Sequence, residues 1–342
     1  MKQVNVHGPE DVRVDEVAEP EAGPRDAVVR VASCGICGSD LRYVRLGGLA
    51  GPTGQPMPLG HELAGVVESV GSEVPCLAPG TRVVLNPTAC GNMIGNGGSE
   101  GGFAPLLLVR NAAQGESLFE IPDRLPFAVA ALAEPLGVGM NAVNRVEARP
   151  GDKVVVFGAG PIGLAAIAAL RDRGVEDVVA VDLSPRRLEI ASALGARATI
   201  DASSDDPWQR LRALHGEAPV LGAKMLGSDA FVEASGAANV ITGILQQAKA
   251  EARLSVVALH SQEIPVNFLL VMIKQLTIRG AMEYPEDFED SLGVLSRWDL
   301  SPMISHHFPL ERFGEALAVA RDPRAGGKVL IDLGTGSEKG NT

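Results

Sequence analysis

The 342-residue sequence has few cysteines, few basic residues and no long apolar runs, and each shortage excludes a class of protein. Its four cysteines are too few for a disulfide scaffold in a chain of this length, so we expect a reducing compartment, the cytoplasm. With 30 basic against 42 acidic residues the net charge is −12, which makes nucleic acid an unfavourable partner. No apolar run approaches membrane-spanning length, so we expect no membrane contact.

Two different patterns along the chain predict two domains, a natural expectation for this length. Residues 27–109 read as short strands separated by Gly and Pro, such as AVVRVAS and LAGVVESVG, which is typical of a small β-rich domain. Residues 154–259 instead alternate apolar strands with amphipathic helices, and Pro161 and Pro185 stand at predicted first turns. This alternation predicts an α/β fold with a doubly wound parallel sheet, after which the chain is expected to rejoin the first domain.

The segment 154–163, VVVFGAGPIG, carries the clearest functional signal. Apolar strand residues lead into Gly158, Gly160 and Gly163 at G-x-G-x-x-G spacing, which lets the backbone approach a pyrophosphate at the N-terminus of the next helix. A second apolar strand follows and ends in Asp182, about 20 residues on, where a carboxylate accepts the ribose hydroxyls of NAD. The residues predicted to contact the dinucleotide are Gly158, Gly160, Pro161, Ile162, Gly163 and Asp182.

Three short segments together indicate a metal site, namely CGICGSD at 34–40, GHE at 60–62 and AEP at 133–135. Each segment alone is ordinary, because a single Cys-x-x-Cys is half a structural zinc site or a redox pair. Together they offer a thiolate, an imidazole and carboxylates from separate segments that precede a nucleotide-binding fold. This donor set suits a zinc ion with an open position for substrate.

The same motifs resemble, in order and over nearly the whole chain, the zinc-dependent medium-chain dehydrogenases, the family of alcohol and polyol dehydrogenases. The stretches that carry the resemblance are GICGSD, PLGHE, SVGSEV, PGTRVVLNP, GGFAP, AALAEPL, GDKVVVFGAGPIG and GGKVLIDL. The resemblance implies a Rossmann dinucleotide-binding domain at 138–271, inserted into a GroES-like catalytic domain at 1–137 and 272–342. It also implies the branch that includes sorbitol and idonate dehydrogenases, because a glutamate stands in the AEP motif where the alcohol branch has cysteine.

The resemblance implies roles around one catalytic zinc ion. Cys37 and His61 correspond to zinc ligands of the family. The carboxylates of Glu62 and Glu134 complete or closely support the coordination sphere, and either of them is a candidate for the direct ligand. Ser39 corresponds to the hydroxyl that accepts the alcohol proton and passes it on through the nicotinamide ribose. Zinc stabilises an alkoxide, so the implied reaction is hydride transfer between a secondary, polyol-like alcohol and NAD.

Three positions depart from the family's pattern. The lobe of four structural-zinc cysteines is reduced to Cys90, so we expect no structural zinc and interpret Cys76 and Cys90 as isolated thiols. Arg42 replaces the histidine at the end of the proton path, and an arginine cannot act as a neutral base, so the proton exit passes to Tyr43 or water. Glu283 replaces a substrate-contacting arginine, which favours a neutral or cationic hydroxyl compound.

The resemblance also predicts the preferred cofactor and the oligomeric assembly. Asp182 repels a 2′-phosphate and favours NAD over NADP, although Arg186 and Arg187 follow closely and Arg187 is expected near the adenosine.

Family members pair through the edge of the nucleotide-binding sheet, so we expect a homodimer or homotetramer formed by the strands after residue 259. Candidate residues for lining the alcohol or ketone pocket, which also suit ordinary packing or surface positions, are Tyr43, Phe103 and Glu283.

Two other functions fit part of the pattern. A zinc-free medium-chain reductase of the quinone or enoyl type has the nucleotide fold, but such proteins lack the set Cys37, His61 and Glu134. A non-catalytic nucleotide-binding protein keeps the fold without the activity, since a fold alone never establishes catalysis. Bound zinc separates the dehydrogenase from the first alternative, and NAD turnover separates both enzymes from the second.

Overall fold

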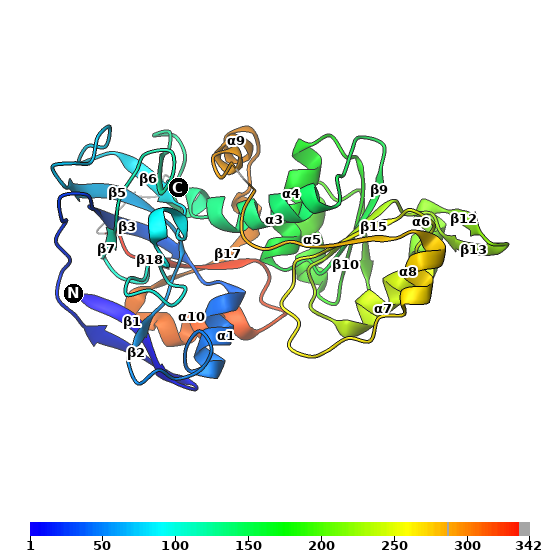
Figure 1. The fold of residues 1–342 in the computed structure, drawn as a ribbon, viewed down its shortest axis with the longest axis horizontal. Coiled ribbons are helices and arrows are strands. Elements are labelled where there is room, and N and C mark those ends of the chain that lie inside the picture. Colours follow the sequence, from blue (N-terminus) through cyan, green and yellow to red (C-terminus); the bar gives the residue numbers. More distant parts are fainter. Residues whose placement is uncertain (286, 335–342) are drawn as a thin grey trace. The chain divides into compact units, whose positions relative to one another are not determined.

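The computed structural model describes residues 1–285 and 287–334, which form two compact units. The chain leaves the first unit, builds the second and then returns to the first, as Figure 1 shows. The first unit comprises Met1–Glu134, Ile304–Asp322 and the described residues from Lys328 onward. The second comprises Pro135–Met303 and Pro323–Gly327.

A seven-stranded sheet in the described residues forms the centre of the first unit. Its outermost pair, β17 and β18, is parallel and the other pairs are antiparallel. In spatial order the strands are β17 (Ile304–Pro309), β18 (Lys328–Asp332), β3 (Ala27–Gly35), β5 (Glu62–Val70), β6 (Arg82–Leu85) and β8 (Leu118–Glu120), with β7 (Leu106–Val109) beside β3. A smaller sheet consists of β2 (Asp11–Glu16), β1 (Lys2–Gly8) and β4 (Met57–Pro58).

Short helices complete the first unit around one apolar core. Valines of β3, such as Val29 and Val31, are fully buried in this core together with Phe103. Burial of branched aliphatic side chains against both sheet and helix supplies the main driving force for this packing. The helical segments are α1 (Gly38–Leu46), η1 (Ala89–Gly91), α2 (Phe127–Ala130), η3 (Leu310–Arg312) and α10 (Phe313–Arg321).

The second unit contains a parallel sheet of six strands within the described residues. Strand order reverses between β9 and β14, which makes the carboxyl ends of these two strands the topological switch point. Residues 154–157 of β9 are all buried, as expected for a strand covered by helices on both faces. In spatial order the strands are β11 (Ala198–Asp201), β10 (Asp177–Asp182), β9 (Lys153–Phe157), β14 (Ala230–Glu233), β15 (Arg253–Val256) and β16 (Thr277–Gly280).

Helices connect these strands, and two of them begin where the sequence predicted. Pro161 and Pro185 are the first residues of α4 and α5, where a proline costs no intrahelical hydrogen bond. No described helix is both long and apolar enough to cross a membrane. The remaining elements are α3 (Ala133–Arg145), α4 (Pro161–Asp172), α5 (Pro185–Leu194), α6 (Pro207–His215), β12 (Glu217–Val220), β13 (Ala223–Leu226), α7 (Ala238–Gln247), α8 (Phe268–Lys274), α9 (Asp290–Arg297) and η2 (Ser301–Met303).

The second unit extends past the expected boundary at residue 271 and begins at Pro135 rather than at 138. Strand β16 joins the parallel sheet beside β15, so the segment LTIRGAM belongs to this unit. Helix α9 is tied to α4, because the Asp172 carboxylate accepts hydrogen bonds from Arg297 Nε at 2.7 Å and from the Trp298 indole at 2.9 Å. The chain therefore rejoins the first unit only at residue 304.

Candidate metal centre and nucleotide site

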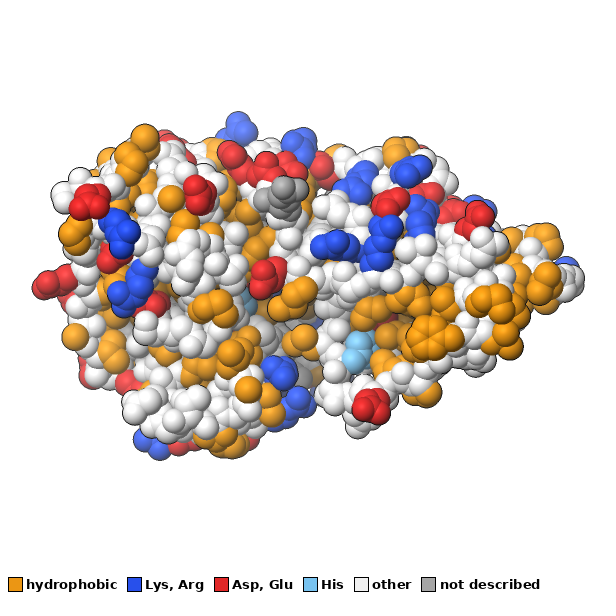
Figure 2. All heavy atoms as spheres, in the orientation of Figure 1, with side chains coloured by type: hydrophobic (Ala, Val, Ile, Leu, Met, Phe, Trp, Pro, Cys, Tyr) orange, Lys and Arg blue, Asp and Glu red, His pale blue; other side chains and the backbone are white. Residues whose placement is uncertain are grey.

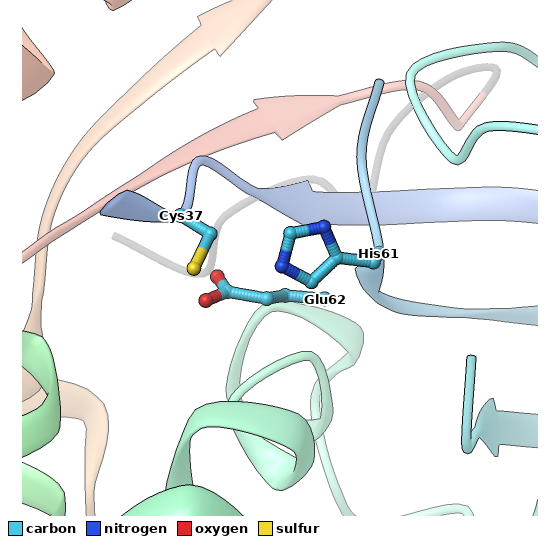
Figure 3. Close-up of side chains that lie close together, drawn as sticks. All are labelled: Cys37, His61 and Glu62. Atoms are coloured by element: carbon cyan, nitrogen blue, oxygen red, sulfur yellow. The ribbon is translucent and has the colours of Figure 1, made fainter. Parts of the chain in front are cut away.

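Three potential metal ligands meet in the first unit, the thiol of Cys37, the imidazole of His61 and the carboxylate of Glu62. Each offers one donor atom, and these atoms lie within 4.8 Å of one another. Figure 3 shows the sulfur, the ring and the carboxylate directed toward a common point. His61 and Glu62 are buried, whereas Cys37 is partly exposed.

Strand pairing brings these three residues together. Cys37 follows β3 and is the N-cap residue of α1, while His61 and Glu62 stand at the start of β5. Strands β3 and β5 are antiparallel, and their register places Gly35 opposite Glu62. The end of one strand therefore lies beside the beginning of the other, although more than 20 residues separate them in the sequence.

Asp40 lies beside two of the candidate ligands, a position to which the sequence analysis gave no role. Its side chain is completely buried, and it accepts a hydrogen bond from the Cys37 backbone N–H at 2.8 Å. The other carboxylate oxygen lies 3.7 Å from His61 Nδ1. Burial raises the pKa of Asp40, since desolvation disfavours its charged form. At this distance Asp40 acts on the ring through its charge, while the opposite ring nitrogen, Nε2, lies beside Ser39.

The imidazole of His61 lies among negative charges. Burial by itself lowers its pKa, but the charges of Asp40 and Cys37 outweigh burial and hold the pKa well above its usual value. Its Nε2 atom lies 3.3 Å from the Ser39 hydroxyl, so the predicted relay serine is adjacent to the candidate ligands. A site that raises the proton affinity of a histidine also favours a metal cation in place of that proton.

Glu62 forms a buried ion pair with Lys328. Lys328, at the start of β18, is 2 % exposed and its ammonium nitrogen lies 2.6 Å from the Glu62 carboxylate. The same nitrogen donates to the Ile36 carbonyl at 3.2 Å. Burial acts to lower the pKa of Lys328, but the adjacent Glu62 charge raises it above its usual value. The sequence signal for this pair was a lysine opening the apolar strand KVLID.

Glu134 lies near the three-residue group without belonging to it. It occupies the first turn of α3 and is buried, with 6 % of its surface exposed. Its negative charge raises the pKa of both His61 and Lys328. Glu134 therefore contributes to the electrostatic environment of the candidate metal ligands. The structure thus brings Cys37, His61 and Glu62 together and places Glu134 at their margin.

Other residues that the sequence singled out in the first unit have distinct positions. Arg42 is exposed, whereas Tyr43 is buried, hydrogen-bonds to Ser39 and donates from its hydroxyl to Asn96 at 3.2 Å. Burial raises the pKa of Tyr43. Phe103 is fully buried in the core, which matches the ordinary packing alternative. Tyr43 thus connects to the predicted relay serine, and Arg42 does not occupy the interior.

The predicted nucleotide loop lies at the switch point of the second unit. Gly158 directly follows β9 with φ of 90°, and a side chain there would press against the Ser235 backbone. A side chain on Gly163 would overlap the carbonyl oxygen of Gly158, so only glycine permits this approach of helix to strand. Gly160 is the N-cap of α4, whose first turn leaves backbone N–H groups free for an anion.

The remaining predicted cofactor residues border this loop. Asp182 ends β10, and its carboxylate accepts hydrogen bonds from the N–H groups of Ala159 at 2.6 Å and Ser184 at 2.8 Å. Arg187 stands in the first turn of α5, donates from Nε to the Gly326 carbonyl at 3.0 Å and reaches toward Gly160. Glu283, by contrast, is exposed, so its position gives no support to a pocket-lining role.

The donor set in the first unit fits zinc. Zinc binds sulfur, nitrogen and oxygen ligands from Cys, His and carboxylate side chains, which is the combination that Cys37, His61 and Glu62 present. Three protein donors leave one position of a tetrahedral zinc ion for water or substrate, as in catalytic zinc sites.

Comparison with known proteins identifies a family for each part of the chain. The family described as alcohol dehydrogenase GroES-like domain matches residues 23–123, and the family described as zinc-binding dehydrogenase matches residues 161–297. Sorbitol dehydrogenase of Homo sapiens is 33% identical over 335 residues, covering 91% of this chain and 90% of its own.

Two solved structures resemble the whole chain. The crystal structure of 2R,3R-butanediol dehydrogenase from Bacillus subtilis superposes with a TM-score of 0.84 and 28% identity, over 97% of this chain and 99% of that one. A zinc-binding dehydrogenase from Sinorhizobium meliloti 1021, solved with NADP, has a TM-score of 0.84 and 27% identity, over 97% and 98% of the two chains.

Proposed function

Since this chain belongs to the zinc-dependent medium-chain dehydrogenase family, we propose that it transfers a hydride between a secondary, polyol-like alcohol and NAD, in either direction. The family membership makes it an oxidoreductase that uses zinc and a nicotinamide cofactor on an alcohol group. Its relatives named for sorbitol and butanediol act on compounds that carry secondary hydroxyls, which supports the substrate class. The observation that carries the proposal is the approach of Cys37, His61 and Glu62 to within 4.8 Å.

We assign one zinc ion per chain to this group. Cys37 and His61 are the proposed ligands, and Glu62 or Glu134 completes the set. When bound, zinc supplies a Lewis acid that lowers the pKa of the alcohol hydroxyl. Asp40 holds the Cys37 backbone through a hydrogen bond and places a negative charge beside the His61 ring, and Lys328 balances the Glu62 charge. These side chains hold the ligands in position before substrate arrives, which is the electrostatic preorganisation that catalysis requires.

Ser39 is the proposed first acceptor of the alcohol proton. Its hydroxyl lies 3.3 Å from His61 Nε2, at the ligand group. It also hydrogen-bonds to Tyr43, whose hydroxyl continues to Asn96. These contacts support Tyr43 as a route for the proton from Ser39, in the place where the family's histidine is replaced by the exposed Arg42.

We propose NAD as the preferred cofactor, because Asp182 presents a carboxylate at the end of β10. The relative solved with NADP makes this preference a matter for experiment. We expect Asp182→Asn to raise the activity ratio of NADP to NAD at least about tenfold, since the substitution removes the negative charge that repels the 2′-phosphate of NADP. Asp201→Asn is the matched control, because Asp201 ends the neighbouring strand β11 opposite Asp182. An unchanged ratio in Asp182→Asn contradicts the assignment.

We also propose that two copies pair through the outer edge of β16, giving a homodimer or, by further pairing, a homotetramer. An edge strand presents unpaired backbone groups, and the helix that precedes β16, α8, carries large exposed apolar side chains. Phe268 and Met272 on α8 are 73% and 65% exposed, and Figure 2 shows hydrophobic side chains gathered over α8. Phe268→Glu combined with Met272→Glu should yield monomers in light scattering, whereas an unchanged oligomer contradicts this interface.

A cytoplasmic location is proposed from the four cysteines, all of which are free thiols. Rapid alkylation of thiols in a denaturant at the moment of cell lysis tests this location, because Cys34 is buried and Cys37 is a proposed zinc ligand in the folded protein. Four alkylated cysteines agree with a reducing compartment, and oxidised cysteines contradict it.

The central experiment measures zinc and turnover in the wild type and in Cys37→Ala. We expect about one zinc per chain and reduction of NAD with polyols or secondary alcohols in the wild type. Cys37→Ala should lose the zinc, and activity should fall at least about 100-fold. Cys76→Ala, which removes an exposed thiol, should change neither. Wild-type protein that binds NAD but holds no supplied zinc would instead support the zinc-free reductase or the non-catalytic alternative.

A further inference from the structure

A buried carboxylate in the second unit has no role in the function proposed so far. Glu233 is the last residue of β14, the strand next to β9 at the switch point, and none of its surface is exposed. One oxygen, Oε1, accepts hydrogen bonds from the Ser235 hydroxyl and from the backbone N–H groups of Ser235 and Gly236. The desolvation cost of a buried carboxylate is offset by such donors.

The second carboxylate oxygen of Glu233, Oε2, forms a hydrogen bond with His260. His260 Nε2 lies 2.8 Å from Glu233 Oε2, and the histidine side chain is 14% exposed. A carboxylate only accepts hydrogen bonds, so the proton of this contact belongs to Nε2 of His260. In the neutral ring, Nδ1 then carries a lone pair. Within residues 1–285 and 287–334, Nδ1 makes no hydrogen bond.

The His260–Glu233 pair lies at the same edge of the sheet as the nucleotide loop. Strands β9, β14 and β15 are parallel, so the residues that follow their carboxyl ends share one edge. A side chain on Gly158 would come within 2.7 Å of the Ser235 backbone, which shows how closely the loop approaches the turn after Glu233. His260 follows β15, and the carbonyl of its neighbour Leu259 lies beside Gly236.

The direction of a bound dinucleotide follows from the strand order. The proposed adenosine side is marked by Asp182, which ends β10 on one side of β9. The pyrophosphate belongs over the glycines that follow β9 itself. The other half of the molecule must then extend across the switch point toward β14 and β15. His260 stands at that end.

We propose that His260 Nδ1 accepts a hydrogen bond from the nicotinamide half of the cofactor and that Glu233 positions it by fixing the proton on Nε2. This inference rests on the proposed use of a nicotinamide dinucleotide. The donors available on that half are the carboxamide N–H and the ribose hydroxyls. His260 is the contact residue, and Glu233 is a positioning residue that acts through it.

The experiment compares NADH with ADP, because ADP shares the adenosine half and lacks nicotinamide. Dissociation constants are measured for the zinc-loaded wild type, His260→Ala and the distant control His307→Ala. We expect His260→Ala to weaken NADH binding about tenfold, the value of one lost hydrogen bond, and to leave ADP binding unchanged. His307→Ala, on an exposed histidine of the first unit, should match the wild type for both ligands.

Glu233→Gln separates positioning from simple structural support. Its amide oxygen still accepts from Ser235 and Gly236, while its amide NH₂ faces His260 and donates to Nε2. The ring proton then moves to Nδ1, which becomes a donor in place of an acceptor. We expect NADH binding to fall by a similar factor, with ADP binding unchanged, and the double variant to be no weaker than His260→Ala alone.

Analogue binding locates the contact. Reduced 3-acetylpyridine adenine dinucleotide has no carboxamide N–H, so an effect of His260→Ala that disappears with this analogue assigns the donor to the carboxamide. An effect that persists assigns it to a ribose hydroxyl. Equal losses for NADH and ADP, or no loss for either, would overturn the inference about His260. Wild-type protein that binds neither ligand would instead refute the proposed cofactor itself.

Discussion

The proposed nucleotide loop and the proposed metal centre differ in which part of the chain forms them. The loop is built from the backbone of one continuous segment, in which Gly158 and Gly163 matter because they lack side chains. The metal centre is built from side chains of separate segments, and the Glu62 charge is balanced by Lys328, which lies 266 residues away in the sequence. Because the loop is one continuous segment, its motif can be read from the sequence. The charged residues that support the metal centre are far apart in the sequence, so they cannot be recognised there.

The two sites also depend on different physical terms. Steric space dominates at the loop, where an added methyl group meets backbone that cannot move aside. Electrostatics dominates at the metal centre, where Lys328 and Glu62 are both withdrawn from water. A buried charge without its partner costs several kcal/mol, so the metal centre should respond most strongly to loss of a single charge.

The largest effect is expected for Lys328→Met, which leaves the Glu62 carboxylate buried without its cation. The unfolding free energy of the first unit in metal-free protein should fall by about 3–5 kcal/mol. Urea denaturation followed by circular dichroism measures this loss. Because both tryptophans, Trp208 and Trp298, lie in the second unit, their fluorescence reports the unfolding of that unit separately.

A second substitution makes this prediction specific. In Lys328→Met combined with Glu62→Gln, the buried charge is absent, so most of the lost stability should return. Tryptophan fluorescence should show the second unit unchanged in both variants. A double variant as unstable as Lys328→Met alone would show that packing, and not charge, sets the cost at this position.

An intermediate effect is expected for Gly163→Ala, which tests the loop in the same way. The added methyl group would overlap the Gly158 carbonyl, so the helix must move away from the strand. We expect NADH binding to weaken about 100-fold, or about 2.7 kcal/mol. The change in NADH fluorescence on binding measures the affinity.

Zinc content shows whether Gly163→Ala affects only the nucleotide loop or also the metal centre. Gly163→Ala should retain the zinc of the wild type, because Cys37, His61 and Glu62 belong to the first unit. Gly314→Ala is the matched control, since a side chain at Gly314 meets nothing within 4 Å. Unchanged NADH affinity in Gly163→Ala would contradict the steric account of the loop.

The smallest effect is expected for Arg297→Gln, a surface counterpart of the buried Lys328 pair. The Arg297 hydrogen bond lowers the pKa of Asp172, so this pair stabilises the second unit above the unfolded aspartate pKa of about 3.9 and loses that effect as the pH falls below it. At pH 7 the variant should lose about 0.5–1 kcal/mol of stability.

Tryptophan fluorescence during urea denaturation at pH 7 and pH 3 measures this difference. The difference between the two proteins should be smaller at pH 3, below the unfolded aspartate pKa, because folding then requires Asp172 to give up a proton before the pair can form. High salt at pH 7 should also reduce the difference, because the Arg297 side chain is 56% exposed. A difference that is equal at both pH values would exclude the ion pair as its source.

Much of the fold was predictable because its signals are local. The helices that begin at Pro161 and Pro185, and the parallel sheet around them, follow from periodicity and first-turn proline. The boundary at residue 271 was placed too early, because no local pattern shows which sheet the short strand β16 joins. The partners of Asp40 and His260 were equally invisible, since each is defined by contacts that form only after strands pair.

The sequence by itself determined the family, the α/β class and the chemical types of the candidate ligands, because motifs and their order are properties of the chain. Only the tertiary structure decided that Cys37, His61 and Glu62 share one volume, with Glu134 at its margin. It also decided that a lysine opening an apolar strand is the counter-ion of Glu62. The physical reason is that burial and charge pairing depend on distances across the fold, which strand register sets and sequence spacing does not.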